Sequence, residues 1–392
     1  MKTTTSIAAE RSRKERVPEL GMLRGMAILG VLMVHATSTA VVEVPNSILR
    51  GLYICLNTFS LFCVPAFIFL SGFVLFYHYF NQTFTFSMLQ TFYKKRFKQM
   101  VIPYLFVSLG YELVEQILNH RSWQAAPMLK LFGEHLLTGK AYPHLYYILI
   151  TLQLYVLFPL LLLLFRKLRL PVKLAVPLGF AVQWAFYLLN RNYWHIAAKG
   201  SWSFTYFAAF LIGAYLGVHS STFKRWYHAN KSDSNAKDVA LLWLLPILWV
   251  AVTIGFLWMY EAYWTGASTP KGYWFEIGYN LFTVMTTLVL LQACVLLGRC
   301  KLTRWLAFVL SKLGMLSFGI YLVHPFFLLV YHRYPLGSAQ PVTYFLWTAG
   351  SFLFALGAST VVTLLAYRFI PWSWIFLGTS PIDRRREMAP QV

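Results

Sequence analysis

Charged residues are scarce in this chain of 392 residues, since Asp, Glu, Lys and Arg together make up only 12% of it. Soluble domains carry about 25% charged residues, so the chain lacks the polar surface that a water-soluble fold of this size needs. Hydrophobic residues make up 58% and aromatic residues 18%, which also excludes an intrinsically disordered chain. The composition therefore indicates a protein with several membrane-spanning segments.

Acidic residues and cysteines are rarer still. The 13 Asp and Glu residues face 34 Lys and Arg residues, which gives a formal net charge of +21. In a membrane chain, Lys and Arg first determine topology, so no nucleic-acid partner is expected. The cysteines, Cys55, Cys63, Cys294 and Cys300, show neither metal-binding nor redox spacing. We therefore expect free thiols, no bound metal and no tightly bound cofactor.

Motifs of several familiar enzyme classes are also missing. There is no Gly-x-Ser-x-Gly elbow, no His-Glu-x-x-His metal site, no P-loop and no dinucleotide fingerprint. His228 and Asp233 match the His-x4-Asp pattern of glycerol-phosphate acyltransferases, but they fall in a short basic loop without the globular fold that this pattern needs. We therefore reject that pattern.

Ten apolar stretches approach the length of about 20 residues that a transmembrane helix requires. They are continuous rather than alternating, which favours helices over the strands of a barrel. They are Leu20–Val42, Ile48–Phe76, Val101–Leu118, His144–Phe165, Val172–Asn190, Trp202–His219, Val239–Tyr260, Phe275–Gly298, Leu313–His332 and Thr343–Phe369. The sequence predicts an all-α polytopic membrane domain of about ten helices over residues 20–370, between basic tails at 1–19 and 371–392.

The basic residues are distributed unevenly between the two sides that these spans define. The N-terminal tail, the four even-numbered loops and the C-terminal end carry 25 of the 34 Lys and Arg residues, while the five odd-numbered loops carry 8. Arg24, within the first span, is the remaining one. Because cytoplasmic segments of membrane proteins are enriched in Lys and Arg, both termini are predicted to be cytoplasmic.

The first span contains two side chains that are costly to place in a bilayer, Arg24 and His35. They are eleven positions apart, so at about 100° per residue they share one helix face. A rise of about 1.5 Å per residue separates them by about 16 Å, which places Arg24 near the cytoplasmic surface and His35 in the outer half. A snorkelling arginine and a helix-packing histidine would also explain the pair.

Further motifs follow in order along the chain. Pro65–Phe73 reads Pro-Ala-Phe-Ile-Phe-Leu-Ser-Gly-Phe, a basic run of Lys94, Lys95, Arg96 and Lys98 precedes Ile102-Pro103-Tyr104, and Ser317–Pro325 reads Ser-Phe-Gly-Ile-Tyr-Leu-Val-His-Pro. Together with the Arg-x10-His element of the first span, this order resembles the bacterial acyltransferase-3 family of integral membrane acyltransferases. Within it, the chain is similar to the branch of intercellular-adhesion polysaccharide proteins.

The resemblance implies transfer of an acyl group, often acetyl, from cytoplasmic acyl-CoA to a hydroxyl of a cell-surface or exported polysaccharide, in a bacterial plasma membrane. It also implies an essential histidine in the first helix, which is His35. A neutral imidazole can take the proton from a hydroxyl that attacks a thioester, although a histidine nucleophile stays open. The planar guanidinium of Arg24 suits a donor phosphate or the thioester carbonyl.

Coenzyme A is polyanionic, so its site needs cations at the cytoplasmic end. The basic run is predicted there, beside Ser71 and Gly72, because the second span ends on the side where the third begins. Gly72 would permit close approach of the pantetheine arm. The enforcement of topology would also account for the basic run.

The outer half of the third span contains Glu112, which we predict to orient or charge His35. A solvated helix end is the alternative. The segment Asn119–Pro143 is the longest loop on that face and is expected to cover an acceptor, because loops often carry specificity.

Four further residues are predicted to line a substrate tunnel. Ser317, Tyr321 and His324 fall at positions i, i+4 and i+7 and share one stripe of the ninth span. His144 begins the fourth span on the outer side, where an acceptor would arrive. Hydrogen bonds between helices and an interfacial aromatic belt would also explain these residues.

A transporter for a lipid-linked sugar or polysaccharide is the alternative function. Transporters usually contain inverted repeats and broken helices at the midplane, and neither is evident in the sequence. A non-catalytic scaffold for a polysaccharide synthase would not require a buried histidine. The preferred interpretation is an acyltransferase, with membrane lipid, acyl-CoA, a glycan acceptor and polysaccharide synthesis or export proteins as expected partners.

Overall fold

The computed structural model describes residues 17–45, 47–120, 124–221, 236–334 and 341–379, apart from the side chains of 236–242. Within these ranges all regular secondary structure is helical, which confirms the predicted all-α class. The main helices are α2 (Pro18–Glu43), α3 (Ile48–Ser60), α4 (Cys63–Tyr79), α5 (Phe86–Arg96), α6 (Ile102–Leu118), α7 (Ala125–Thr138), α8 (Tyr146–Arg166), α9 (Ala175–Leu189), α10 (Phe207–Val218), α12 (Ala236–Trp264), α13 (Gly272–Arg299), α14 (Arg304–His332), α15 (Pro341–Phe369) and α16 (Trp374–Leu377). The pattern at His228 and Asp233 and most of both basic tails lie outside the described residues.

Nine helical segments of the described chain are long and apolar enough to cross a membrane, and they coincide with nine of the ten predicted spans. The tenth, predicted at Trp202–His219, is the shorter apolar helix Ser203–Val218, a 3₁₀ turn followed by α10. Nine of the twelve residues of α10 are buried. This helix is therefore surrounded by other helices, and lipid covers little of it.

The second predicted span, Ile48–Phe76, is interrupted. Helix α3 ends at Ser60 and α4 begins at Cys63. Pro65 lacks a backbone N–H, and its ring clashes with the carbonyl four residues earlier, at Leu61, in a continuous helix. The interruption lies where this clash would fall, so the proline explains it.

The third predicted span extends further toward its N-terminus than the sequence suggested. Helices α5 and α6 are joined through a π-helical segment, Phe97–Val101, into one stretch over Phe86–Leu118. Pro103 cannot donate the hydrogen bond that an α-helix would direct to Gln99, which favours a wider turn at this point. The basic run therefore lies on a helix, where its side chains have fixed directions.

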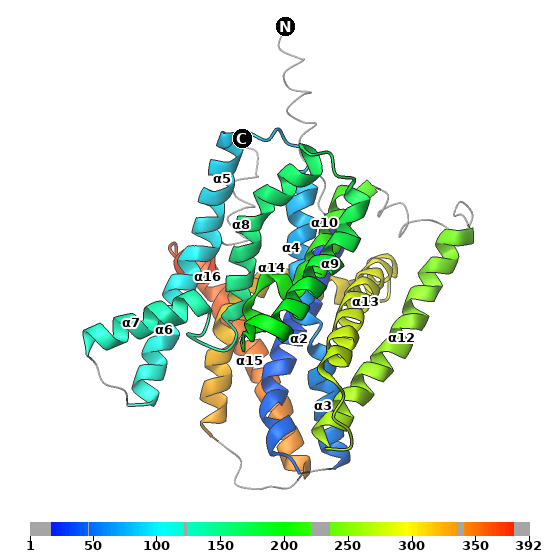
Figure 1. Ribbon diagram of the computed structural model, residues 1–392. Helices are drawn as coiled ribbons and strands as arrows, with labels where there is room; N and C mark the ends of the chain where they lie inside the picture. Colours follow the sequence, from blue (N-terminus) through cyan, green and yellow to red (C-terminus); the bar gives the residue numbers. More distant parts are fainter. Residues whose placement is uncertain (1–16, 46, 121–123, 222–235, 335–340, 380–392) are drawn as a thin grey trace.

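Helices α2 and α14 pack at the centre of the bundle through glycines (Figure 1). A Cβ atom at Gly314 would overlap the carbonyl oxygen of Gly21, and one at Gly25 would overlap that of Leu310. Small residues allow such close approach of backbones in membrane proteins. The two helices run in the same direction, because Gly25 lies beside Leu310 and His35 lies beside His324.

Burial separates the helices into a core and a periphery. In their most apolar stretches, 67% of the α3–α4 residues and 56% of those in α2 and α14 are buried, against 17% for α12 and 22% for α15. Figure 1 shows α12 at the edge of the bundle. Because so few of their described residues are buried, α12 and α15 present large apolar faces to lipid.

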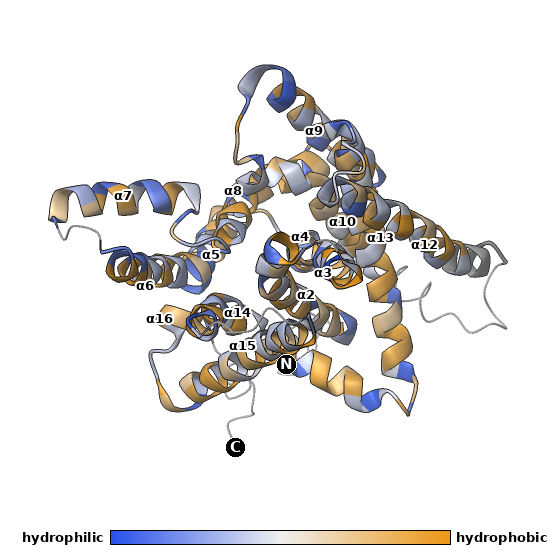
Figure 2. Cartoon of the chain, turned by 90° about the horizontal axis from the view of Figure 1, so that it is seen from below, coloured by the Kyte–Doolittle hydropathy of each residue, from blue (hydrophilic) through white to orange (hydrophobic). Residues whose placement is uncertain are grey.

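The outer segment predicted as a long loop contains a helix, α7. Figures 1 and 2 show α7 projecting sideways from the bundle next to α6, with hydrophilic and hydrophobic residues both along its length. The hydroxyl of Tyr104 on α6 donates a hydrogen bond to the carbonyl of Leu136 at 2.5 Å. This segment is therefore attached to the bundle through α6.

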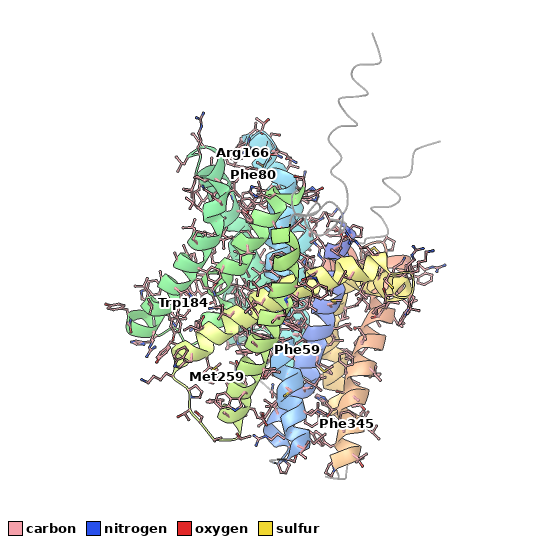
Figure 3. All side chains as sticks on the ribbon, turned by 90° about the vertical axis from the view of Figure 1, so that its right-hand side faces the viewer. Phe59, Phe80, Arg166, Trp184, Met259 and Phe345 are labelled. Atoms are coloured by element: carbon pink, nitrogen blue, oxygen red, sulfur yellow. The ribbon has the colours of Figure 1, made fainter. Side chains whose placement is uncertain are left out.

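The helix ends in the structure fall on the same two sides of the membrane as the loops between the predicted spans. Phe80, just after α4, and Arg166, at the end of α8, lie at one end of the bundle, and Phe345, near the start of α15, lies at the other (Figure 3). Arg166 donates a hydrogen bond to the carbonyl of Gln82. Which end faces the cytoplasm stays a prediction from the distribution of Lys and Arg.

We expect Gly314→Leu to lower the stability of the protein by about 1–3 kcal/mol, because the added side chain forces α2 away from α14. Thermal unfolding of the purified protein in detergent measures this effect. Gly357→Leu on α15 is the matched control, since a Cβ atom there meets nothing within 4 Å. Equal unfolding temperatures for the two variants would contradict the importance of the α2–α14 contact.

Cys300, directly after α13, tests the orientation without any added residue. It is exposed, whereas Cys63 and Cys294 are buried. Hydrogen bonds from the backbone of Leu302 and from Thr303 lower the pKa of its thiol, so its reactive thiolate form persists to lower pH than usual. A membrane-impermeant maleimide should label Cys300 only after the cells are permeabilised. Labelling of intact cells that Cys300→Ser abolishes would reverse the predicted orientation.

Candidate active site

A cavity of about 540 Å³ lies among α2, α4, α5, α8 and α14. This volume is within the range of sites that bind small molecules and cofactors. It is lined by Arg24, Phe67, Leu70, Ser71, Val74, His78, Tyr79, Gln82, Lys95, Arg96, Gln99, Met100, Tyr147, Thr151, Tyr155, Gly314, Met315, Ser317, Phe318, Tyr321 and Thr379. The cavity therefore combines three cations with hydroxyl, amide and aromatic side chains.

The cations of the cavity come from two places in the chain. Arg24 extends from α2, and Lys95 and Arg96 come from the end of α5. The guanidinium of Arg96 lies 4.8 Å from the ring centre of Tyr155, a distance suited to a cation–π interaction. Lys95 is exposed, so this end of the cavity is accessible from solution.

The other two cations of the basic run do not line the cavity. Lys94 is exposed and absent from its wall. The ammonium of Lys98 lies 4.5 Å from the ring centre of Trp374 on α16. The basic run thus contains two residues that line the cavity, Lys95 and Arg96, one that contacts α16, Lys98, and one that does neither, Lys94.

Ser71 and Gly72, predicted as neighbours at the donor site, point in different directions. Ser71 lines the cavity, and its hydroxyl donates to the carbonyl of Phe67 at 3.0 Å. Gly72 faces α10, where a Cβ atom would overlap the carbonyl oxygen of Phe210. The close approach that we expected between Gly72 and the donor is made between two helices instead.

The start of the predicted C-terminal tail, 371–392, is part of the cavity wall. Thr379 lines the cavity, and its hydroxyl accepts a hydrogen bond from the amide of Gln99 at 3.2 Å. The hydroxyl of Tyr367 donates to the carbonyl of Leu377 at 2.7 Å. Residues 371–379 therefore pack against the π-helical segment, α6 and the end of α15, and the basic tail as a domain of its own stays a prediction.

One side of the cavity was missed by the sequence reasoning. Tyr147, Thr151 and Tyr155 line it from α8. They lie four residues apart, so they share one face of that helix. From the sequence, Tyr147 was considered together with His144 as a residue near the arrival of an acceptor or as part of an interfacial aromatic belt, and Thr151 and Tyr155 were not considered. The spacing of polar groups in an otherwise apolar helix was the signal that could have identified this face.

Three histidines from distant parts of the chain form a cluster next to the cavity. The ring centres of His35 on α2 and His324 on α14 are 5.3 Å apart, and those of His324 and His144 are 5.6 Å apart. His324 and His144 are 0% and 1% exposed, whereas His35 is half-buried. The structure thus brings together two predicted tunnel residues and the predicted catalytic histidine.

Hydrogen bonds determine the tautomer of His324. Its Nδ1 lies 2.8 Å from the carbonyl oxygen of Tyr321, so Nδ1 carries the proton and Nε2 has a free lone pair. Nε2 is buried without a hydrogen-bond partner, and so are both ring nitrogens of His144. Next to His35 on α2, the side chain of Asn57 on α3 donates to the carbonyl of Val34 at 3.0 Å, which attaches α3 to this turn of α2.

Tyr321 joins the cavity to the histidine cluster. It lines the cavity, and its hydroxyl donates a hydrogen bond to the carbonyl of His144. Its ring centre is 5.1 Å from that of His144 and 5.5 Å from that of Tyr147, another wall residue. A single aromatic side chain therefore contacts both regions. Ser317, one turn earlier on α14, lines the cavity as well.

Glu112 has an imidazole partner, but it comes from α7. The carboxylate Oε2 lies 2.7 Å from Nδ1 of His135, and Glu112 is buried. This pair attaches α7 to α6. The structure therefore gives no support to the hypothesis that Glu112 orients His35.

The cluster does not have the geometry of a metal site. Across the part of the chain that the structure describes, no group of three or more His, Cys, Asp or Glu side chains is arranged to hold a metal ion.

Comparison with known proteins identifies the family. A family model described as an acyltransferase domain, of the acyltransferase-3 type, matches residues 17–367. No curated protein and no solved structure matches the chain significantly. The matched region contains all nine membrane-spanning segments of the described chain except the last residues of α15. Because the match covers most of its length, the chain belongs to the acyltransferase-3 family and is a multi-pass membrane acyltransferase.

Proposed function

We propose that this protein transfers an acyl group, in the simplest case acetyl, from acyl-CoA in the cytoplasm to a hydroxyl of a cell-surface or exported polysaccharide. The plasma membrane of a bacterium is the proposed location. The observation that carries the proposal is the position of a cation-lined cavity beside a buried histidine cluster, with Tyr321 in contact with both. Membership of the acyltransferase-3 family establishes acyl transfer. The cavity and the histidine cluster support the proposed donor, acyl-CoA, and the proposed acceptor, a polysaccharide hydroxyl.

The donor binds in the cavity with its phosphates at the end where Lys95 and Arg96 lie. Phosphate oxygens are strong acceptors for ammonium and guanidinium groups. Lys95 is exposed, so the bulky nucleotide stays at the mouth while the thin pantetheine arm enters. The polar and aromatic wall formed by Ser71, Thr151 and Tyr155 suits the amides of that arm.

The reacting end of the donor lies beyond Arg24. This arginine is half-buried and stands about 16 Å from His35 along a continuous helix. A guanidinium at this point can donate to a carbonyl oxygen of the pantetheine arm, which holds the donor with its thioester further along the site. The thioester is thus directed toward Tyr321 and the histidine cluster.

His35 acts as the general base. Its imidazole takes the proton of the acceptor hydroxyl while the hydroxyl oxygen forms a bond to the acyl carbon. The carbon–sulfur bond then breaks, and the resulting thiolate takes the proton from the imidazolium. The products are an ester and free coenzyme A, and His35 returns to its neutral state.

Replacing His35 tests this role. We expect His35→Ala to reduce transfer from radiolabelled acetyl-CoA to glycan by about 10²- to 10⁴-fold, the usual contribution of a general base. Binding of CoA should change little, because His35 does not line the cavity. Ser38→Ala, at an exposed position on the same helix, is the matched control. Transfer by His35→Ala at the rate of that control would refute the assignment.

Neighbouring lysines offer a sharp test of the donor site. Lys95→Gln should weaken CoA binding about three- to tenfold, whereas Lys94→Gln, beside it but outside the cavity, should leave it unchanged. Arg24→Lys should weaken binding or transfer more strongly, because lysine lacks the planar fork of donors. Titration of the purified protein with CoA measures these constants. Equal effects at Lys94 and Lys95 would show that the basic run acts only through overall charge.

A further inference from the structure

Several ring nitrogens of the histidine cluster lack a hydrogen-bond partner, which is unusual for buried polar groups. Nε2 of His324 and both ring nitrogens of His144 are buried and have no partner. Leaving a buried polar group without a partner costs roughly 1–3 kcal/mol. Three such atoms gathered around two adjacent rings indicate that a polar ligand completes the site.

The state of these rings restricts the chemistry of that ligand. Neutral imidazole has one donor and one acceptor nitrogen, and His324 uses its donor on the carbonyl of Tyr321. Its Nε2 can only accept a hydrogen bond, while His144 can donate one and accept one. A ligand that both donates and accepts, such as a hydroxyl, satisfies these nitrogens. A carboxylate or phosphate would face the lone pair of Nε2 and be repelled.

Aromatic side chains surround His144 on its other sides. Its ring centre lies 5.2 Å from that of Tyr111 and 5.7 Å from that of Tyr142, and those two tyrosine rings stack at 4.3 Å. Tyr142 is only partly buried and precedes α8 at the end opposite Arg166. Flat aromatic rings beside a hydroxyl-binding site are suited to the faces of sugars.

We propose that His144 and His324 bind the acceptor sugar, with one of its hydroxyls presented to His35. Sugars carry neighbouring hydroxyls, so one can donate to His35 and another to Nε2 of His324, while His144 donates to either oxygen. The sugar enters past Tyr142 and Tyr111, on the side opposite the donor's phosphates. This inference rests on the proposed function, because it takes His35 as the base.

Phenylalanine substitutions test the proposal, since they keep a flat ring and remove the nitrogens. Cells whose only copy of the protein carries His144→Phe or His324→Phe should show at least tenfold less acetyl ester on their surface glycan by mass spectrometry. The dissociation constant of CoA for each purified variant should stay within twofold of the parent value. His332→Phe is the matched control, because His332 is on α14 but stacks on Trp347 at 4.9 Å, outside the cluster; it should retain parental ester.

The conservative variants His144→Asn and His324→Gln guard against a purely structural effect. They keep hydrogen-bonding groups and should retain more ester than the phenylalanine variants. Parental ester in the phenylalanine variants, no advantage of the conservative variants, or weaker CoA binding in step with ester loss would each overturn the proposal. If His35→Ala retains parental ester, the proposed function fails instead, whatever the other two histidines do.

Discussion

The close approach of α2 and α14 is the constraint on which the site depends. Gly25 and Gly314 bring the two backbones into direct contact, in place of the side-chain layer that normally separates helices. Because the helices are parallel, the same contact sets Arg24 beside the turn at Gly314 and His35 beside His324. A shift of one helix by a single turn would separate the rings of His35 and His324.

A second pair of helices, α4 and α10, also packs closely through glycines. Glycines 72, 213 and 217 bring α4 against α10 in the same manner, which fixes the face of α4 that carries Ser71 toward the cavity. Helix α8 completes the cavity wall with its polar stripe, and the ring of its Tyr155 lies 4.8 Å from the guanidinium of Arg96. Glycines thus set the spacing of the two helix pairs, α2–α14 and α4–α10, that position three of the helices lining the cavity.

Much of the fold was predictable from the sequence, because long apolar runs and scarce charges permit few alternatives in a membrane. Arg24 and His35 were identifiable because of their cost in a bilayer, His324 because of its motif, and His144 because it begins a span on the predicted outer side. The partner of Glu112 was not predictable, since the supposed loop folds as α7 and supplies His135. Nor was the role of Thr379, because no local pattern shows that residues after the last span return to the cavity. Gly72 illustrates the general limit: a motif identifies a residue but not the direction in which it faces.

The most direct test of the account is the position of coenzyme A in an experimental structure of the complex. The account predicts phosphates against Lys95 and Arg96, the pantetheine arm passing Arg24, and the sulfur directed toward Tyr321 and the ring of His35. Coenzyme A bound outside this cavity, or with its sulfur directed away from the histidine cluster, would contradict it.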